Sequence, residues 1–417
     1  AWKDVLPIFR RCEGNTRGAD EFHGADGPLK VSDLAWAHPV TDAFVAAGRQ
    51  AGLTENDDFN GPVQEGVGRY QLTQSGGERW SVARAFLHPV LARPNLTVVT
   101  GARVSRVLID GRRAVGVQCR IRGAQRRIEG GTVLLCGGAI NSPQLLLLSG
   151  IGAREELEPH GIGQIHDLPG VGRNLQDHPD ALVVHRSRRR DTLSLGPGYR
   201  ARAVPSAGRY ARQREGALTS NVAGSGGCSK SRDSEAIPGL QLHLSAALLD
   251  NHGLNWKFSM GWGYSAHVSV LRPRARGSVR LADANPATAA AIDPDLLGHP
   301  EDMECLLRGI RRTRDILRQS ALAPWRGEEL LPGPQVQDDD GLRAFVRRKA
   351  ETIYHPVGTC KMGHDDMAVV DDTLKVHGLE SLYVVDASIM PSLIGGNTNA
   401  PVVMIADKAA EGILGSH

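Results

Sequence analysis

The sequence predicts a mixed α/β protein in which one sheet domain is interrupted by a second domain. Strand patterns gather in residues 96–136 and return at 382–385, and the region between them has a different texture, with many polar, proline and arginine residues. The length of 417 residues is enough for more than one buried core. Glycine accounts for 49 of the 417 residues, which exceeds its usual share of about 7%. Such an excess favours tight turns and close backbone approaches, as nucleotide sites require.

The N-terminal half begins with a helix pattern and continues with strands. Val5, Leu6, Ile8 and Phe9 give the start of the chain an amphipathic helical pattern. Residues 96–100 are a short β-branched run that predicts a strand. The strands predicted over 104–109 and 114–121 flank Asp110-Gly111, a dipeptide typical of hairpin turns.

A further strand, over 132–136, is followed by the first well-marked helix. Ser142 is a good N-cap, Pro143 fits the first turn and Gly150 ends the helix. Towards the C-terminus, the periodicity predicts a helix over Glu301–Arg318, a strand over Leu382–Val385 and a final helix over Val402–Ile413.

Composition excludes several classes of protein. The formal net charge of +3 gives no electrostatic case for a nucleic-acid partner, and the basic run Arg186–Arg190 is interpreted as a solvated loop. No apolar run reaches the length of about 18 residues that a transmembrane helix needs. The six cysteines include no Cys-x-x-Cys pair, which argues against a disulfide framework or a zinc ribbon. A reducing, cytoplasmic location is therefore expected.

The chain opens with Ala1-Trp2-Lys3, without a methionine and inside a helical pattern. We therefore expect this start to be an interior position of a longer protein, in which N-terminal targeting signals would not be visible.

The segment from Tyr354 to Gly363 is a candidate for catalysis. His355 is followed by a proline and two glycines, so it lies on a rigid, tightly turning loop that suits a general base. The alternative is a histidine that only holds the loop by hydrogen bonds. Cys360 and His364 lie nearby, but no further compact ligand set accompanies them, so no metal site is expected.

Two more segments join a structural element to a loop in a way that suits ligand binding. Asp386 follows a buried strand, at the strand end where ligands of open α/β sheets collect, although an Asx turn that closes the strand is the alternative. The run Gly395–Pro401 leads into the final helix, whose N-terminal N–H groups could face a developing negative charge. Simple helix capping is the alternative there.

Together these segments resemble the glucose–methanol–choline (GMC) family of flavoprotein oxidoreductases, closest to its choline-dehydrogenase and alcohol-dehydrogenase branch. The matching motifs are Gly138–Gly152, Leu168–His178, Arg79-x-Ser-x-Ala-Arg-Ala-x-Leu, His355-Pro-x-Gly-Thr-Cys-Lys-Met-Gly, Val385-Asp-Ala-Ser-x-Met-Pro and Asn397-Thr-Asn-Ala-Pro. These motifs are spread over nearly the whole chain and follow one another in the order that the family has, so coincidence does not explain them.

The resemblance implies FAD as the cofactor and gives individual residues a role. His355 matches the family's active-site histidine, and Asn399 matches its second active-site position, which is histidine or asparagine. Val104 would meet the adenine end of FAD through its backbone. The residues expected along the rest of the cofactor are Ala139, Asp386, Ala387, Asn399, Ala400 and Pro401.

The implied reaction is the oxidation of a primary alcohol, choline-like or aliphatic, to an aldehyde by hydride transfer to flavin N5. His355, with a pKa near neutrality, would take the hydroxyl proton. Asn399 would hydrogen-bond to the alcohol oxygen, and the helix that follows would stabilise charge on the reduced ring.

The implied fold is an FAD-binding Rossmann-like domain that lacks its first βαβ unit, together with a substrate-binding domain of mainly antiparallel sheet and helices. Residues 1–90 would be a lid or attachment segment, 91–158 and 376–417 the FAD-binding domain, and 159–375 the substrate-binding domain.

One family motif, the G-x-G-x-x-G turn that holds the FAD pyrophosphate, has no match in the sequence. The G-x-G sites considered, at Gly150, Gly161, Gly170 and Gly224, all lack the third glycine. The chain is therefore expected to be truncated at its N-terminus. The parent protein is predicted to be a flavoenzyme, and the isolated chain a remnant that does not bind FAD. A family-related FAD lyase and a non-enzymatic scaffold are the other hypotheses.

The substrate and the electron acceptor are less well defined. Trp256, Trp262 and Tyr264 are candidates for an aromatic cage around the ammonium of choline, but core packing is the favoured interpretation. The partners expected are a small alcohol and an acceptor that could be a quinone, a dye or oxygen. Peripheral membrane association of the parent protein is also open.

Overall fold

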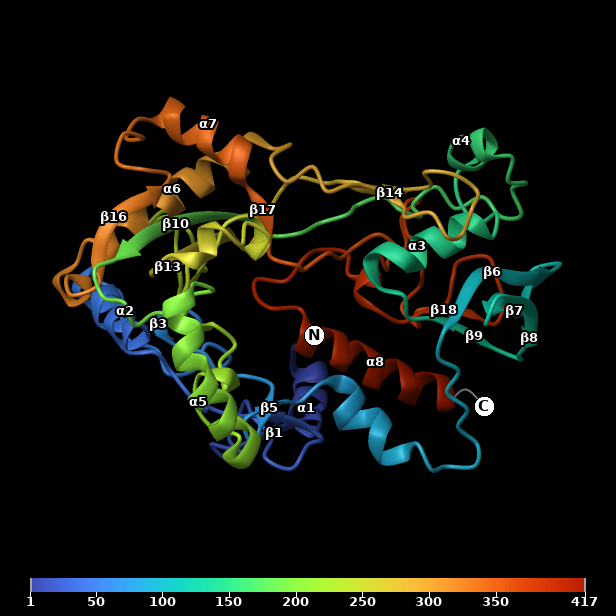
Figure 1. Cartoon of the computed structure of the whole chain (residues 1–417). Helices are drawn as coiled ribbons and strands as arrows, with labels where there is room; N and C mark the ends of the chain where they lie inside the picture. The colour runs from blue at the N-terminus through green and yellow to red at the C-terminus, as the bar shows by residue number, and fades with distance from the viewer. Residues whose placement is uncertain (1, 416–417) are drawn as a thin grey trace. The chain divides into compact units, whose positions relative to one another are not determined.

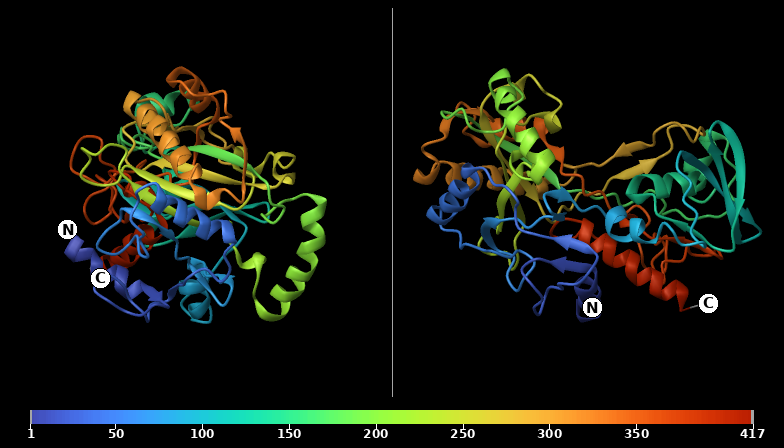
Figure 2. Two further views of the ribbon diagram at one scale, coloured as in Figure 1. Left: turned by 90° about the vertical axis from the view of Figure 1, so that its left-hand side faces the viewer. Right: turned by 60° about the horizontal axis from the view of Figure 1, so that its bottom comes forward.

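The computed structural model describes residues 2–415 and, within them, all side chains but those of Pro197 and residues 200–202. The chain forms two compact units, each assembled from separate stretches (Figures 1 and 2). Unit 1 contains the residues up to Pro89, Pro179–Arg272 and His299–Ile353. Unit 2 contains Val90–His178, Pro273–Gly298 and the residues from Tyr354 on.

Unit 1 is built on a seven-stranded antiparallel sheet. Its strand order is β16-β10-β13-β12-β11-β3, and β17 also pairs with β10. These strands are β3 (Gly66–Arg69), β10 (Pro179–Ser187), β11 (Ala223–Ser229), β12 (Leu240–Ser245), β13 (Gly263–Val270), β16 (Arg326–Leu331) and β17 (Glu351–Thr352).

The central strands of this sheet are buried on both faces, so they do not show the alternation of a half-exposed strand. The helices α2 (Pro39–Gln50) and α6 (Pro300–Leu317) pack on the sheet, α2 against β11 and β3 and α6 against β10 and β13. A Cβ atom at Gly309 of α6 would lie 2.6 Å from a methyl carbon of Val268. Glycine therefore allows this helix to approach the strand closely.

The remaining elements of unit 1 are short or peripheral. They are α1 (Trp2–Cys12), β1 (Glu13–Asn15), β2 (Leu29–Val31), β4 (Gln74–Ser75), β5 (Glu78–Arg79), α5 (Pro197–Gln213) and α7 (Asp339–Lys349). The amphipathic pattern at the start of the chain is thus confirmed as the helix α1 (Figure 1).

Unit 2 contains a three-stranded antiparallel sheet and a two-stranded parallel sheet. The first has the order β6-β7-β8, with β6 (Ala102–Asp110), β7 (Arg113–Ile121) and β8 (Ala124–Glu129). The second pairs β9 (Val133–Leu135) with β18 (Leu382–Val384). The other elements are α3 (Gly138–Leu148), α4 (Arg154–Leu157), β14 (Ser278–Arg280), β15 (Ala291–Asp293) and α8 (Asn399–Leu414).

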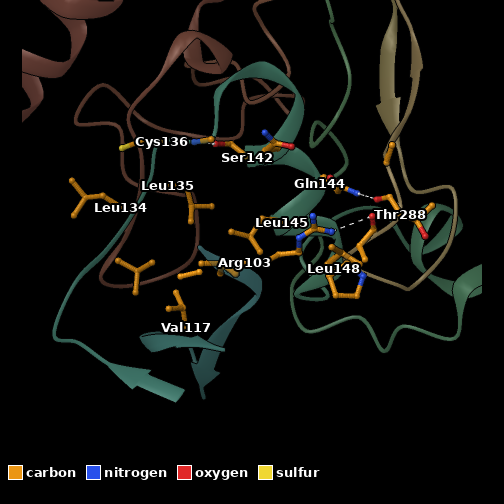
Figure 3. A pocket seen from close by; sticks show the side chains of 18 residues that line it. Arg103, Val117, Leu134, Leu135, Cys136, Ser142, Gln144, Leu145, Leu148 and Thr288 are labelled. Carbon is orange, nitrogen blue, oxygen red and sulfur yellow. Dashed lines mark hydrogen bonds between the residues drawn. The ribbon is translucent and has the colours of Figure 1, made fainter. Parts of the chain in front are cut away.

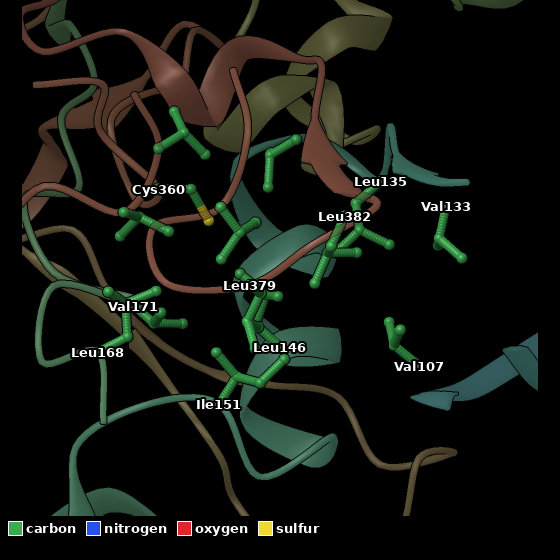
Figure 4. Close-up of a cluster of buried hydrophobic side chains, with 14 of the residues drawn as sticks. Val107, Val133, Leu135, Leu146, Ile151, Leu168, Val171, Cys360, Leu379 and Leu382 are labelled. Carbon is green, nitrogen blue, oxygen red and sulfur yellow. The ribbon is translucent and has the colours of Figure 1, made fainter. Parts of the chain in front are cut away.

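A buried apolar cluster joins the two parallel strands of unit 2 to α3 and to residues between Cys360 and Leu379 (Figure 4). Leu146 of α3 and Leu382 of β18 are fully buried within it. Burial of such side chains stabilises the fold by about 1.5–3 kcal/mol each. The end of β9 and the end of β18 are therefore held at fixed places in the same core.

Most of the local predictions are confirmed within a few residues. The hairpin around Asp110-Gly111, the strands β9 and β18, and the helices α6 and α8 all form where the sequence predicts them. The strand predicted over 96–100 is wrong, because no described strand pairs with it and Val98 and Val99 remain exposed. A β-branched run becomes a strand only where a neighbouring strand receives it.

The first helix of unit 2 begins earlier than predicted. It starts at Gly138, so Ser142 lies inside α3 and is not its N-cap. The Ser142 hydroxyl instead accepts from the N–H of Gly137 (2.9 Å). This contact closes the turn between β9 and α3.

The expected fold class, a mixed α/β chain with a mainly antiparallel second domain, agrees with this architecture. The compact units do not follow the expected domain boundaries throughout, since residues 159–178, 273–298 and 354–375 belong to unit 2. The assignment of FAD and substrate to particular domains stays a prediction. No helix within residues 2–415 combines the length and apolarity required to cross a bilayer.

Candidate active site

The loop that carries His355 is held against residues 174–178 of the same unit. Gln176 and Val357 exchange two backbone hydrogen bonds, with N–O distances of 3.0 and 2.9 Å. Gly358 has a φ of +94°, and a Cβ atom there would lie 2.5 Å from the carbonyl oxygen of Asn174. Only glycine tolerates this conformation and this approach at low cost, which explains the glycine that follows the histidine so closely.

A single carboxylate fixes the backbone of two histidines. Asp177 Oδ1 accepts from the N–H of His178 (2.8 Å) and from the N–H of His355 (3.0 Å). Asp177 is buried. Two backbone donors on one buried carboxylate oxygen define the relative position of the two histidines well, because charge-assisted hydrogen bonds are stronger than neutral ones.

The side chains of these histidines form a short chain of contacts. Nδ1 of His355 lies 3.0 Å from Nδ1 of His178, and Nε2 of His178 lies 3.0 Å from the carbonyl oxygen of Ile394. The two rings meet edge to face, at 87° with centroids 5.2 Å apart. On the other side of His355, Nε2 lies 3.4 Å from the amide nitrogen of Asn397.

Burial lowers the pKa of His355 from its usual value of 6.5 to about 4. The residue is only 9% exposed, so its charged form loses most of its hydration. The expectation of a pKa near neutrality is therefore wrong. His355 is a neutral imidazole at physiological pH and can accept a proton there.

The structure places Asn397 beside His355 and puts Asn399 at the first residue of α8. Both side chains are exposed in the described structure. The role predicted for Asn399 stays a prediction. The sequence analysis singled out Asn399 and missed the contact of Asn397, which lies two positions earlier in the same motif.

The carboxylate of Asp386 accepts the hydrogen bonds that connect the end of β18 with the β9–α3 turn. Its Oδ2 accepts from the N–H of Gly138 (2.8 Å) and from Ser142 Oγ (2.6 Å), and its Oδ1 accepts from the N–H (2.8 Å) and Oγ (2.5 Å) of Ser388. The four donors engage both carboxylate oxygens of this buried residue. Asp386 therefore ties the end of β18 to the first turn of α3.

The histidine loop is attached to the same turn. Thr359 Oγ1 donates to the carbonyl oxygen of Ala139 (2.6 Å), and the N–H of Cys360 donates to the carbonyl oxygen of Ser388 (2.9 Å). The segments that the sequence singled out at 138–152, 355–363 and 385–391 are therefore brought together in unit 2. Cys360 is fully buried, and His364 lies outside this cluster, paired with Asp372 at 3.0 Å. Within residues 2–415, no group of three or more acidic, histidine or cysteine side chains is arranged to hold a metal ion.

An open pocket of about 600 Å³ lies beside the β9–α3 turn (Figure 3). Its walls are mainly apolar and come from β6, β9 and α3, with Val104, Leu134 and Leu145 among them. On one side Arg103 donates to the carbonyl of Ala287 (3.2 Å), while Gln144 donates to the carbonyl of Thr288 (2.9 Å). Of the predicted cofactor residues, Val104 is the one found among the described residues that line this pocket.

Comparison with known proteins assigns the chain to a family. Residues 1–180 match the N-terminal and residues 273–406 the C-terminal model of the GMC oxidoreductases. The chain is 46% identical to an alcohol dehydrogenase [acceptor] of Pseudomonas putida, over 99% of this chain and 75% of that protein. It is 44% identical to the mitochondrial choline dehydrogenase of Mus musculus, over 98% of this chain and 69% of that protein.

Solved structures agree with this assignment. A pyridoxine 4-oxidase from Mesorbium loti matches with a TM-score of 0.88 and 31% identity, over 100% of this chain and 78% of that chain. A formate oxidase from Aspergillus oryzae, the subject of a study of FAD modification, matches with a TM-score of 0.90 and 25% identity, again over 100% and 78%. The motifs, the fold and these matches agree, and the chain belongs to the GMC oxidoreductases, a family of FAD-dependent flavoenzymes.

Proposed function

We propose that the protein oxidises a primary alcohol to an aldehyde with FAD, and that His355 is the base that takes the hydroxyl proton. The observation that carries the proposal is the buried, neutral imidazole of His355, whose Nε2 lies beside the amide of Asn397. The relatives named alcohol dehydrogenase and choline dehydrogenase support an alcohol as the substrate.

The residues present fit part of the FAD site. Gly138 has a φ of +76°, and a Cβ atom there would meet no atom within 4 Å, so the turn after β9 leaves room for a ligand. The apolar pocket beside it, with Val104 in its wall, suits a planar aromatic ring. When bound, FAD supplies the acceptor for the hydride of the alcohol carbon.

The other proposed contacts of FAD come from the segments around this turn. They are Ala139, Ala387, Ala400 and Pro401, with Asp386 acting mainly by position. The Asp386 carboxylate already receives four donors from the protein. It would therefore shape the cofactor turn rather than bind FAD with its own oxygens.

Two groups of the protein take part in the proposed reaction, Nε2 of His355 and the side-chain amide of Asn397 beside it. The alcohol oxygen would take a hydrogen bond from Asn397 Nδ2, and its proton would move to Nε2 of His355 as the O–H bond breaks. Because the imidazole of this buried residue is neutral, Nε2 can accept the proton without first losing one. An imidazolium formed in this way is unstable in a buried site, which favours release of the proton afterwards.

The first test is whether an alcohol reduces the flavin. Binding of FAD is measured first, because the sequence analysis predicts that this chain alone does not hold the cofactor. The FAD-loaded protein is then freed of oxygen and mixed with choline or with aliphatic primary alcohols. We expect at least one of them to bleach the yellow flavin absorbance, and reoxidation with oxygen or with a quinone then identifies the acceptor. Retention of FAD without bleaching by any alcohol would favour the lyase hypothesis and contradict an oxidative function.

The second test separates the two asparagines. Asn397→Ala is expected to lower the rate of flavin bleaching by about tenfold, which corresponds to one lost hydrogen bond of about 1.4 kcal/mol. Asn399→Ala serves as the matched comparison at the same helix start, and its effect is expected to be smaller. A larger loss at Asn399 than at Asn397 would return the role to Asn399.

Two of the three aromatic residues considered for choline, Tyr264 and Trp256, do not support a cage. Tyr264 is fully buried and stacks on His185, with ring centroids 5.7 Å apart. Trp256 is exposed, and the ammonium of Lys257 lies 5.9 Å from its ring centroid. Tyr264 belongs to the core, as the sequence analysis favoured, so the proposal does not commit to choline over an aliphatic alcohol.

A further inference from the structure

His178 and His355 lie 177 positions apart in the sequence and share one hydrogen bond between their Nδ1 atoms, at 3.0 Å. His178 is fully buried, and both residues belong to unit 2. The remaining ring nitrogen of each has a defined neighbour, the carbonyl of Ile394 for His178 and the amide of Asn397 for His355. These neighbours decide where the protons of the pair lie.

The carbonyl oxygen of Ile394 identifies the nitrogen of His178 that carries a hydrogen. A carbonyl oxygen only accepts, so the Nε2 of His178 that faces it at 3.0 Å must carry a hydrogen. We take His178 to be neutral, so it carries one such hydrogen and its Nδ1 is an acceptor. The hydrogen between the two Nδ1 atoms therefore belongs to His355.

The position of this hydrogen also determines the state of the other ring nitrogen of His355, Nε2. With its hydrogen on Nδ1, its Nε2 presents a lone pair, and this is the nitrogen beside the Asn397 amide donor. The other neutral tautomer of His355 would set two lone pairs against each other at 3.0 Å in a buried site. It would also set its own N–H against the N–H of Asn397.

We propose that His178 is a positioning residue that holds His355 in the tautomer with an unprotonated Nε2, the form that a base for the alcohol proton must have. The inference rests on the proposed function for its role in the reaction, but the tautomer itself is independent of it. Asp177 contributes by fixing the backbone N–H of both histidines on one carboxylate oxygen.

The direct test is the ¹⁵N spectrum of the histidine-labelled chain, with the His355 signals identified by their loss in His355→Gln. We expect Nδ1 of His355 to give the shift of a protonated ring nitrogen and Nε2 that of an unprotonated one. His178→Leu, which removes the acceptor, is expected to give a mixture of tautomers. His178→Asn, whose side-chain oxygen can take the place of Nδ1, is expected to restore the single tautomer.

The same variants, loaded with FAD, supply a second readout. His178→Leu is expected to lower the rate of flavin bleaching at least about tenfold, and His178→Asn to recover most of it. A protonated Nε2 on His355 in the unaltered chain would overturn the inference, and this result needs no variant to fold. A single unchanged tautomer in His178→Leu would overturn it as well. Full activity of His355→Gln would instead contradict the proposed function and leave the tautomer assignment standing.

Discussion

His355→Ala in the FAD-loaded protein is expected to lower the rate of flavin bleaching by an alcohol at least about 10²-fold. The substitution removes the group proposed to accept the hydroxyl proton, and no other imidazole nitrogen replaces it, because the Nε2 of His178 faces Ile394. Anaerobic stopped-flow measurements, in which oxygen plays no part, isolate this step.

The matched control for this prediction is His364→Ala. His364 lies nine positions further along the same segment, but its side chain is 74% exposed and pairs with Asp372. Its removal is expected to leave the bleaching rate within about twofold, because His364 lies outside the cluster around His355. Its exposed ion pair also contributes little to stability. Equal rates for the two variants, with equal FAD content, would remove His355 from the reaction.

Asp386→Ala is expected to give the largest loss of stability among the residues of the site, roughly 3 kcal/mol or more. The substitution leaves the N–H groups of Gly138 and Ser388 and the hydroxyl groups of Ser142 and Ser388 without their common acceptor. Chemical denaturation followed by circular dichroism measures the change in the free energy of unfolding.

Two further variants bracket this effect. Asp386→Asn keeps one acceptor oxygen and is expected to fall between the unaltered chain and Asp386→Ala. Asp372→Ala removes a carboxylate that is 72% exposed and is expected to change the free energy of unfolding by less than about 1 kcal/mol. An Asp386→Ala variant as stable as Asp372→Ala would show that the four hydrogen bonds do not hold the turn.

The sequence predicts best the elements whose signals are local. The hairpin from Ala102 to Ile121 forms around a turn dipeptide, and the helix α6 has an amphipathic period, a proline in its first turn and acidic residues beside it. These features act within a few residues, so neither needs the rest of the fold to be recognised.

The predictions that failed depended on contacts distant in sequence. Residues 96–100 have the composition of a strand, but they find no partner strand among the described residues. The start of α3 depends on Asp386, which accepts from Gly138 across 248 positions of the chain. Local propensity favoured Ser142 as the cap, and the distant carboxylate moved the start to Gly138.

The properties of the site that the sequence did not predict also depend on contacts distant in sequence. His355 was found through its motif, but its pKa was not, because the lowering comes from burial by the folded chain. His178 lies within a motif that the sequence analysis used only to recognise the family. Its contact with His355 depends on the pairing of Gln176 with Val357, which no sequence pattern indicates.

The most direct test of His355 as the base is the pH dependence of the rate constant for flavin bleaching at low alcohol concentration. Protonated His355 cannot accept a proton, and burial lowers its pKa from 6.5 to about 4. We therefore expect the rate constant to stay level from about pH 8 to about pH 6 and to fall to half near pH 4. A fall to half at pH 6.5 or above, or the same profile in His355→Gln, would contradict a buried, neutral His355 as the base.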